Sequence, residues 1–405
     1  MRGLRIGFVG AGWSPAPGGV ETVTRDLAEE LQVRGHEVAA LCLDRSGREE
    51  DGERRDFRRA GVHLRRIAWS FQADKALSDL ARTPAQETRV LAWAADLELD
   101  LVHLHDLSGF GLGVPPRLAE LGLPVVWTLH DYWALCPRGQ MLHIEGTLCE
   151  LADVATCGEC AGRTWPQLVA PAGTEAALAL RFEAARAAFE ACARVYSPSR
   201  ASLALLSRHG IASELCENGL TPALVLPRCS LGETLRVGVL GAVQPSKGVL
   251  ELAGWIAGSQ GIELHVHGPR PSYHGDSAYT SALEALARSS PQVHLHPAYA
   301  AHELPQILST KHLIAVPSLW NEVFGLTARE ARLAGLPVFA ARVGGLTEGD
   351  FELIAPGDKG AWMAAFERFR SDSAWRASLT EECAAPRSMS AVADQLEADY
   401  CALVR

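Results

Sequence analysis

The sequence predicts an α/β protein built from two doubly wound parallel-sheet domains. Near the N-terminus a short apolar stretch, residues 5–9, fits a buried parallel strand and leads into a glycine-rich loop. After this loop, apolar side chains recur at helical spacing at Val20, Val23, Leu27 and Leu31. The same order of strand and loop returns at residues 235–248. Because strand, glycine loop and helix open a nucleotide-binding α/β domain, two such starts in 405 residues indicate two domains.

Composition and charge narrow the class of protein. Hydrophobic residues make up 48% and charged residues 21% of the chain, as in ordinary soluble globular proteins. The net charge of −10 argues against nucleic acid as a partner, because phosphate binding needs a basic surface. No run of about eighteen apolar residues is present and the N-terminus leads straight into a strand, so we expect a cytoplasmic protein. Ten cysteines in a chain of this length do not indicate a secreted disulfide scaffold.

The loop after the first strand carries two glycine elements. Residues 10–12 read Gly-Ala-Gly, but Pro15 replaces the third glycine of a dinucleotide fingerprint, so this signal is weak. Gly18 and Gly19 stand at the start of the following helix, where two glycines let the backbone approach a bound anion closely. The alternative is a plain tight turn.

Two later strands of the first half end in histidine. Residues 100–106 form one strand with His105 near its end, and residues 124–133 form another with His130. The carboxyl ends of parallel strands face the ligand crevice in this class of fold. We therefore take His105 as a candidate acceptor contact and His130 as a candidate site residue, against a purely structural role for each.

The charged run 45–66 indicates a solvated surface, with a membrane or anionic-acceptor contact as the alternative.

Four cysteines follow within one loop-like segment: Cys136, Cys149, Cys157 and Cys160. The last two form a C-x2-C pair, and four thiolates suit a structural tetrahedral zinc ion. The spacing is uneven, and His143 offers a spare ligand. The alternative is a set of reduced, partly buried thiols.

The second half opens with a possible phosphate loop. Gly241 ends its first strand, and Lys247 stands in the loop before the next helix. A cation over a loop at a helix start is where a diphosphate would lie. Lysine occurs only four times in the chain, so its presence here draws attention.

Two glutamates with seven residues between them, Glu322 and Glu330, form the most informative stretch. A helix should start near Gly325 or Leu326 and stop at Gly335. On that helix Glu330 falls in an apolar stripe with Leu326 and Leu333, where a carboxylate is costly unless it is satisfied. Glu322 precedes the free N–H groups of the first helical turn, which form an anion site. The alternative is a buried glutamate paired with an arginine and a second that caps the helix.

These motifs, with residues 317–320 before them and 344–348 after them, resemble the retaining glycosyltransferases of family 4, which have the two-Rossmann GT-B fold. The resemblance covers most of the chain. It implies two Rossmann-like domains facing across a cleft: residues 1–200 as the acceptor domain with a Cys-rich insertion at about 136–165, and 234–385 as the nucleotide-sugar donor domain. Residues 201–233 would hold the last elements of the first domain and a linker. Residues 386–405 would form a helix crossing back to the first domain.

The resemblance also assigns roles. Glu322 would contact the donor sugar, and Glu330 would hold the ribose hydroxyls. His130 would contact the sugar near the reacting centre, and Gly18 and Gly19 would lie near the donor phosphate and the acceptor. Backbone N–H groups would reach sugar and phosphate from Phe324, Gly325, Leu326 and Thr327.

One position departs from the family pattern. The family has an arginine directly after the glycine that corresponds to Gly241, and here Ala242 stands there. One expected phosphate contact is therefore missing, and Lys247, which matches the family's second cation, would carry more of the charge.

The expected function is transfer of a sugar from a nucleoside-diphosphate sugar to a hydroxyl of a carbohydrate, lipid-linked or small-molecule acceptor, with retention at the anomeric carbon. No Asp-x-Asp motif stands at a strand end, so no catalytic divalent metal is expected. Two alternatives stay open: a nucleotide-sugar epimerase of the same architecture, and a non-catalytic nucleotide-sugar-binding protein. The sequence does not specify base, sugar, acceptor or oligomeric state.

Overall fold

The computed structural model describes residues 3–10, 12–13, 18–70, 76–168, 173–221, 229–380 and 386–404. Contacts between residues divide the chain into two compact units. The first contains residues 1–16, 20–219 and 387–405, and the second contains residues 17–19 and 220–386. The predicted linker prolines, Pro222 and Pro227, lie outside the described residues.

The first unit is built on an eight-stranded sheet with the order β3-β4-β2-β1-β5-β6-β7-β8. Its strands are β1 (Arg5–Gly10), β2 (Glu37–Asp44), β3 (Arg54–Arg59), β4 (Val62–Ala68), β5 (Leu101–Leu104), β6 (Val125–Thr128), β7 (Arg194–Ser197) and β8 (Glu214–Leu215). All neighbours pair in parallel except β3 and β4, which are antiparallel. The strand order reverses at β1, as in a doubly wound sheet.

Helices connect the parallel strands of the first unit. They are α1 (Gly19–Val33), α2 (Pro84–Asp96), α3 (Val114–Glu120), α4 (Val154–Thr164), α5 (Thr174–Glu190) and α6 (Arg200–Arg208). The first unit also contains α13 (Met389–Leu403), the last helix of the chain, which connects no strands. Parallel strands need such crossovers, because a tight turn cannot return the chain to the same end of the sheet.

The second unit has a six-stranded, wholly parallel sheet with the order β11-β10-β9-β12-β13-β14. Its strands are β9 (Leu235–Leu240), β10 (Ile262–His267), β11 (Val293–His296), β12 (Leu313–Val316), β13 (Val338–Ala341) and β14 (Glu352–Ile354). Its helices are α7 (Val249–Ile256), α8 (Ala278–Ser289), α9 (Leu304–Ser309), α10 (Leu326–Leu333), α11 (Lys359–Ser371) and α12 (Ser373–Ser378). The prediction of an α/β protein with two doubly wound, mainly parallel sheets is confirmed.

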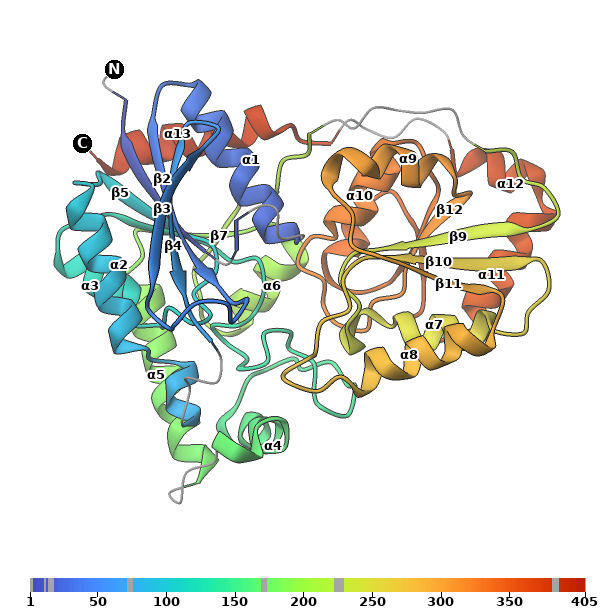
Figure 1. The fold of residues 1–405 in the computed structure, drawn as a ribbon, viewed down its shortest axis with the longest axis horizontal. Coiled ribbons are helices and arrows are strands. Elements are labelled where there is room, and N and C mark those ends of the chain that lie inside the picture. The colour runs from blue at the N-terminus through green and yellow to red at the C-terminus, as the bar shows by residue number, and fades with distance from the viewer. Residues whose placement is uncertain are drawn as a thin grey trace. The chain divides into compact units, whose positions relative to one another are not determined.

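Helices cover both faces of the second sheet, which buries its strands. Figure 1 shows α7 and α8 along one face and α9 and α10 along the other. Strand side chains such as Val237, Leu264 and Ile314 are fully buried, together with Trp362 of α11. Burial on both faces explains why β12 and β13 are apolar runs, whereas β10 and β11 alternate apolar residues with half-buried polar ones.

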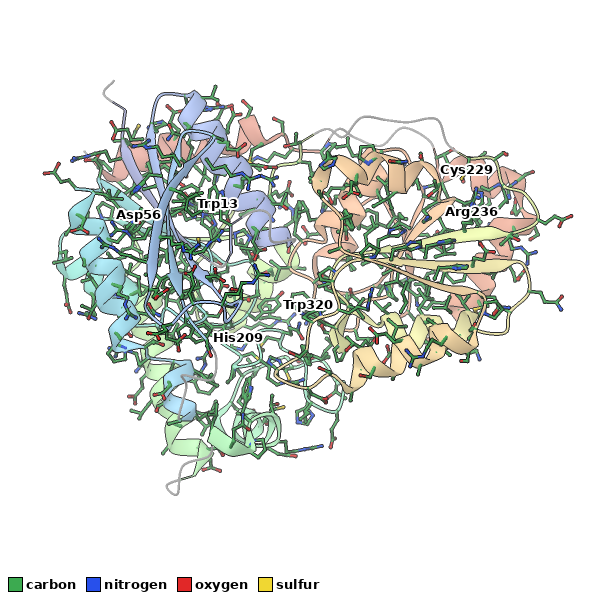
Figure 2. All side chains as sticks on the ribbon, in the orientation of Figure 1. Trp13, Asp56, His209, Cys229, Arg236 and Trp320 are labelled. Carbon is green, nitrogen blue, oxygen red and sulfur yellow. The ribbon has the colours of Figure 1, made fainter. Side chains whose placement is uncertain are left out.

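The charged run 45–66 is only partly the solvated surface that the sequence predicted. β3 is exposed, but Val62 and Leu64 of β4 are fully buried. Arg65 is also buried, and its Nε atom donates to Asp56 Oδ1 at 2.9 Å. Asp56 is labelled in Figure 2. The prediction was wrong for β4 because its core-facing residues stand between arginines, which mask the alternation in sequence.

The terminal helix α13 packs within the first unit. Tyr400 and His103 of β5 are both fully buried, and the Tyr400 hydroxyl lies 2.5 Å from His103 Nδ1. The other ring nitrogen of His103 lies 2.8 Å from Thr128 Oγ1 on β6. Arg34, just after α1, contacts Asp394 of α13 at 2.6 Å. The end of the chain is therefore part of the first unit's core.

Gly219 permits this close packing. A Cβ atom at this position would lie 2.5 Å from the Cα atom of Met389, the first residue of α13. Any side chain at position 219 would therefore push the terminal helix away from the end of the first unit's main segment.

Within the described residues, no helix combines the length and apolar character needed to cross a membrane.

Tyr400→Phe should lower the free energy of unfolding by about 1–3 kcal/mol, because it removes a buried hydrogen bond and leaves His103 Nδ1 without that partner. Urea unfolding followed by circular dichroism measures the change. Ala398→Ser, at an exposed position of the same helix, is the control and should change stability by less than about 0.5 kcal/mol. Equal stability of Tyr400→Phe and the wild type would contradict an anchoring role for the hydroxyl.

Candidate active site

The carboxyl ends of β9 and β12 meet where the strand order of the second sheet reverses. β9 has β10 on one side and β12 on the other. Ligands of open α/β sheets bind at such a switch point. The segment after β9 carries Lys247 and the segment after β12 carries Glu322. The topology thus places two residues that the sequence singled out separately at neighbouring strand ends.

Lys247 and Glu322 are in direct contact. Lys247 Nζ lies 2.5 Å from Glu322 Oε1, and Ser318 Oγ donates to the same oxygen at 2.5 Å. The ammonium also lies over the ring of Trp320, 5.2 Å from its centroid, in the region marked in Figure 2. The Glu322 side chain is 7% exposed, whereas that of Lys247 is 32% exposed. The carboxylate is therefore held in place while the cation stays accessible.

The two loops that carry this pair are bonded through their backbones. Leu319 N donates to Ser246 O at 2.8 Å. Gly248 has a left-handed backbone with φ of 63°, and a Cβ atom there would lie 2.2 Å from Pro317 O. Only glycine allows so close an approach in this conformation.

A third loop, between β13 and β14, grips the backbone of Glu322. Gly345 N donates to Glu322 O at 2.6 Å. Gly344, with φ of 48°, approaches so closely that an added Cβ would lie 2.3 Å from the same carbonyl oxygen. These glycines open the short 3-10 helix Gly344–Glu348. These contacts hold the backbone of Glu322 in place.

The helix after Glu322 starts at a glycine. Gly325 precedes α10 in a left-handed conformation, with φ of 79° and ψ of 54°, and no side chain caps the helix. The first N–H groups of an α-helix have no acceptor within the helix, so Leu326 and Thr327 offer donors to an anion. Phe324, just before, is buried.

Arg329 of α10 braces this segment, and the sequence analysis missed it. Its guanidinium lies over the ring of Phe324, 4.2 Å from the centroid. Its Nε atom donates to Phe324 O at 3.1 Å, and its Nη2 atom donates to Gly345 O at 3.1 Å. Arg329 thereby joins the Glu322 loop to the loop of Gly344 and Gly345. An arginine one position before a motif glutamate could have suggested this.

The predicted buried stripe of α10 was wrong. Leu326, Glu330 and Leu333 are only half-buried, and the residues that face the core are Ala328, Ala331 and Arg332. The two alanines let this short helix lie close to β12 and β13, so the small side chains rather than the leucines face the sheet.

Glu330 lies close enough to Tyr299, in the segment that follows β11, to influence the pKa of its hydroxyl. Burial raises the pKa of Tyr299, and the nearby Glu330 carboxylate raises it further. Glu330 is half-buried. Its carboxylate therefore lies beside a chain segment at the carboxyl end of a neighbouring strand.

Gly241 borders the start of α10. It has φ of 103°, and a Cβ atom built on it would lie 4.0 Å from Thr327 Cγ2. Gly268, which follows β10, comes so close that its own added Cβ would lie 2.0 Å from Gly241 O. The backbones at these two strand ends therefore pack too closely for a side chain at position 268.

In the first unit, His105 and His130 are brought together. His105 Nδ1 lies 3.0 Å from His130 Nε2, and the two rings stack. Burial lowers the pKa of His130 to about 4 and that of His105 well below its usual value. Both imidazoles are therefore neutral at pH 7.

Gly18 precedes α1 and Gly19 opens it, while Ala11 and residues 14–17 lie outside the described residues.

Carboxyl groups of the first unit lie close enough to influence one another. Burial raises the pKa of Asp131 to about 7, and the charge of Asp106 acts in the same direction. Burial also raises the pKa of Glu21, in the first turn of α1. Perturbed carboxyl groups at strand ends are typical of functional sites. The sequence analysis did not select them, because single acidic residues carry no distinctive spacing.

The four cysteines of the predicted zinc segment are free thiols, with Cys149 half-buried and the other three buried. As they stand, no three of their sulfur atoms lie within 4.8 Å of one another. Zinc binding stays a prediction.

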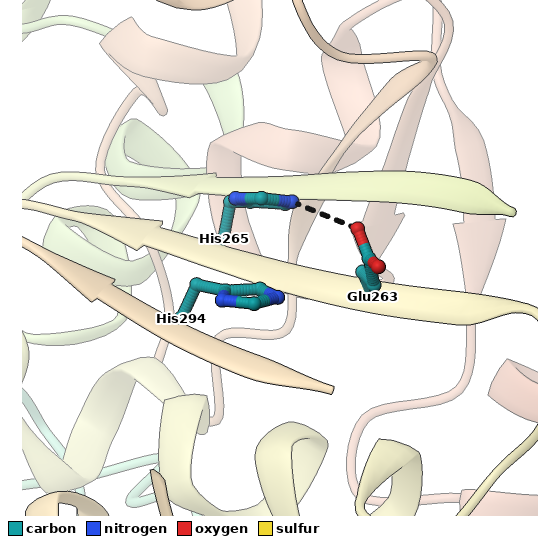
Figure 3. Close-up of side chains that lie close together, drawn as sticks. All are labelled: Glu263, His265 and His294. Carbon is teal, nitrogen blue, oxygen red and sulfur yellow. Dashed lines mark ion pairs between the residues drawn. The ribbon is translucent and has the colours of Figure 1, made fainter. Parts of the chain in front are cut away.

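A different cluster meets that distance limit. Among the described residues, Glu263, His265 and His294 form the one group of three ligand side chains with atoms within 4.8 Å (Figure 3). Its surroundings are positive, however. Arg236 of β9 stands opposite Glu263 of β10 in the sheet. Burial lowers the pKa of His265 to about 3, and the charge of Lys311 acts in the same direction. A single carboxylate beside two cations leaves no negative charge to attract a metal ion, so we interpret this cluster as stacked imidazoles.

The two doubly wound units and the paired Lys247 and Glu322 at a strand-order reversal define an α/β protein of the GT-B class. Sucrose-phosphate synthase from Thermosynechococcus elongatus has the same fold, with a TM-score of 0.70 and 20% identity over 99% of both chains. Anabaena Alr3699/HepE, solved in complex with UDP and glucose, has a TM-score of 0.65 and 18% identity over 98% of this chain and 99% of that chain.

Sequence comparison identifies the family. The profile described as Glycosyltransferase Family 4 matches residues 17–223, and that described as Glycosyl transferases group 1 matches residues 234–372. The chain belongs to glycosyltransferase family 4.

Two curated relatives match over shorter segments. The D-inositol 3-phosphate glycosyltransferase of Stackebrandtia nassauensis is 41% identical over 85 residues, 20% of this chain and 19% of that protein. The one from Corynebacterium diphtheriae is 38% identical over 106 residues, 24% and 25% respectively. The chain thus matches about a fifth to a quarter of the length of these relatives.

Gly344→Ala should displace the Glu322 loop, because a Cβ atom would meet the Glu322 carbonyl and the left-handed backbone would be strained. We expect a loss of about 1–3 kcal/mol in unfolding free energy and weaker binding of nucleoside diphosphates. Chemical unfolding and calorimetry measure the two effects. Gly254→Ala on α7, where an added Cβ meets nothing within 4 Å, is the matched control and should be neutral or stabilising. If both variants behave alike, Gly344 does not position Glu322.

Proposed function

We propose that this chain is a retaining glycosyltransferase that moves a sugar from a nucleoside-diphosphate sugar to an acceptor hydroxyl. The observation that carries the proposal is the contact of Lys247 Nζ with Glu322 Oε1 at the switch point of the second sheet. A cation and a carboxylate held side by side suit a ligand whose diphosphate is negative and whose neighbouring sugar presents hydroxyl donors.

The diphosphate would bind to Lys247 and to the N–H groups at the start of α10. Its arrival draws the ammonium toward phosphate oxygens and frees Glu322 Oε1, still bonded to Ser318, to accept from a sugar hydroxyl. As the bond from the anomeric carbon to the diphosphate breaks, negative charge develops on the phosphate. Preorganised donors stabilise that charge most effectively, because they need no reorganisation during the reaction.

The transfer exchanges one bond at the anomeric carbon for another. The bond to the diphosphate oxygen breaks and a bond to the acceptor oxygen forms on the same face, while the acceptor proton moves to the departing phosphate. Glu330 would hold the ribose hydroxyls. The family resemblance assigns His130 to the donor sugar, and His105, at 3.0 Å from it, would orient that ring.

The donor and acceptor classes follow from the chemistry of relatives. The Anabaena protein was solved with UDP and glucose, which makes UDP-sugars the first donors to test. Relatives named for D-inositol 3-phosphate indicate small hydroxylated acceptors, and carbohydrate or lipid-linked acceptors belong to the same chemical class. A lipid-linked acceptor would place the chain at the inner face of the membrane.

Thermal stabilisation by UDP, ADP and GDP, followed by product analysis with the sugar donor of the best nucleotide, tests the proposal. A nucleotide at a hundred times its dissociation constant stabilises the fold by about 2.7 kcal/mol. Transfer to an acceptor with retention supports the proposal. Conversion of the donor into its epimer would favour an epimerase, and binding with neither product would favour a non-catalytic nucleotide-sugar-binding protein.

Lys247→Ala should reduce turnover by about a hundredfold or more, comparable to losing one preorganised donor to a developing anion. Lys359→Ala, at an exposed helix start of the same unit, is the control and should keep full turnover. Thermal unfolding shows whether each variant is folded, since Glu322 loses its partner. Ala242→Arg in the Lys247→Ala background should restore part of the rate. Near-normal turnover of folded Lys247→Ala would show that this loop is not the diphosphate site.

We further propose that no divalent metal takes part in transfer, and that any zinc held by the cysteines is structural. Brief treatment with EDTA, short enough to leave tightly held zinc in place, should leave turnover unchanged. Turnover measured before and after treatment, with magnesium or manganese added back, checks this. Loss of activity that either ion restores would contradict a lysine-based mechanism.

A further inference from the structure

The four cysteines of the first unit occupy two neighbouring pieces of structure. Cys136 begins a turn in which Gly139 N donates to Cys136 O at 2.8 Å. The chain then folds back on itself through a bridge between Leu142 and Leu148, and Cys149 N donates to Met141 O at 2.9 Å. Cys157 and Cys160 lie three residues apart on α4, so their side chains share one face of that helix.

The thiols of the two pieces lie close enough to influence one another. Ile144 N, in the folded-back segment, donates to Cys160 Sγ on α4 at 3.3 Å. Cys157 interacts electrostatically with Cys136 and Cys149, and Cys149 interacts with Cys136 and Cys160. Hydrogen bonds to sulfur also surround cysteine thiolates that bind iron–sulfur clusters.

A buried cation stands beside this group. Arg181 of α5 is 2% exposed, and no carboxylate among the described residues forms an ion pair with it. Its Nη1 atom donates to Leu80 O at 2.9 Å, its Nη2 atom donates to Trp133 O, and its guanidinium lies over the Trp133 ring, 4.4 Å from the centroid. Its Nε atom has no hydrogen-bond partner among the described residues.

A buried guanidinium needs a counter-charge. Arginine stays protonated in proteins. Cys157 packs in one buried cluster with Leu80, whose carbonyl Arg181 binds, so a cysteine of this group lies close to the guanidinium. Asp131 forms no ion pair with Arg181 among the described residues, and its Oδ1 atom accepts from Trp133 N at 2.8 Å. An uncompensated charge in a protein interior costs several kcal/mol. Thiolates are the remaining source of negative charge.

We propose that Cys136, Cys149, Cys157 and Cys160 bind one zinc ion and that Arg181 balances the negative charge of the resulting centre. Four thiolates and one Zn²⁺ carry a net charge of −2, which leaves an excess for the guanidinium to offset. Binding releases the four thiol protons to solvent. Zinc–sulfur bonds of about 2.3 Å require the sulfur atoms to draw together.

This centre would fix the segment that follows β6. Arg181 holds the carbonyl of Trp133, whose own N–H donates to Asp131 Oδ1 at 2.8 Å. His130 directly precedes Asp131. Arg181 is thus a positioning residue through which a zinc centre stabilises the histidine-bearing strand end. The inference does not depend on the proposed transfer reaction, because its readout is metal content.

The test is elemental analysis of the full-length chain, purified without chelator. We expect about one zinc per chain in the wild type and in Cys229→Ser, which alters a free thiol of the second unit, and almost none in Cys149→Ser and Cys157→Ser. Cobalt substitution of the wild type should give thiolate-to-cobalt charge-transfer absorption, which identifies sulfur ligands even if a cysteine variant fails to fold. Full zinc content in folded Cys157→Ser, or a wild type that binds neither zinc nor cobalt and whose four thiols react freely, would overturn the proposal.

Arg181 has a separate test. Arg181→Met keeps the packing on Trp133 and removes the charge, so zinc should be lost to a competing chelator about ten to a hundred times more readily, the usual effect of removing a group around the ligands. Arg181→Lys, which keeps the charge, should recover much of the difference. Equal zinc retention in folded Arg181→Met and wild type would show that the guanidinium does not balance the centre.

Discussion

The contact between Lys247 and Glu322 exists only because β9 and β12 are neighbours in a parallel sheet. In a doubly wound sheet the first strand stands in the middle, and the chain adds strands on one side before it crosses to the other. The loop after β9 and the loop after β12 therefore meet at one point of the sheet edge, although 75 positions separate the two residues. Ser318 and Trp320 approach the pair from the second loop, and α10 starts directly beside it.

Glycines make this meeting of loops sterically possible. Gly248 lets the first loop touch the second, and Gly344 lets the β13–β14 loop touch the carbonyl of Glu322. Each has a positive φ, which other residues adopt only with strain, and neither position has space for a side chain. Arg329 then locks the second and third loops together through two backbone carbonyls. The result is a carboxylate with little freedom beside a cation that can still move.

The first unit buries several polar side chains, and these differ in how their hydrogen-bonding groups and charges are satisfied. His103 is satisfied on both ring nitrogens by Tyr400 and Thr128, so it is stable as a neutral ring in the core. His105 and His130 contact each other through one ring nitrogen each, and His105 Nε2 has no hydrogen-bond partner among the described residues. Arg181 is bonded only to carbonyl oxygens, which leaves its charge without a carboxylate partner. That difference sets Arg181 apart from the other buried polar groups and connects it to the cysteines.

The sequence alone determined the class of fold, because strand, loop and helix patterns repeat at both domain starts and local periodicity depends only on neighbouring residues. It also selected Glu322, Glu330 and Lys247, since their spacing and the family resemblance are readable along the chain. Tertiary structure decided what no local pattern encodes. It brought Lys247 into contact with Glu322. It turned alanines of α10, rather than Leu326 and Leu333, toward the sheet. It also buried Arg65, which stands in an arginine-rich stretch that the sequence predicted to be exposed. These outcomes depend on which strands become neighbours and how closely a helix can approach them, and both are set by packing between segments that are distant in sequence.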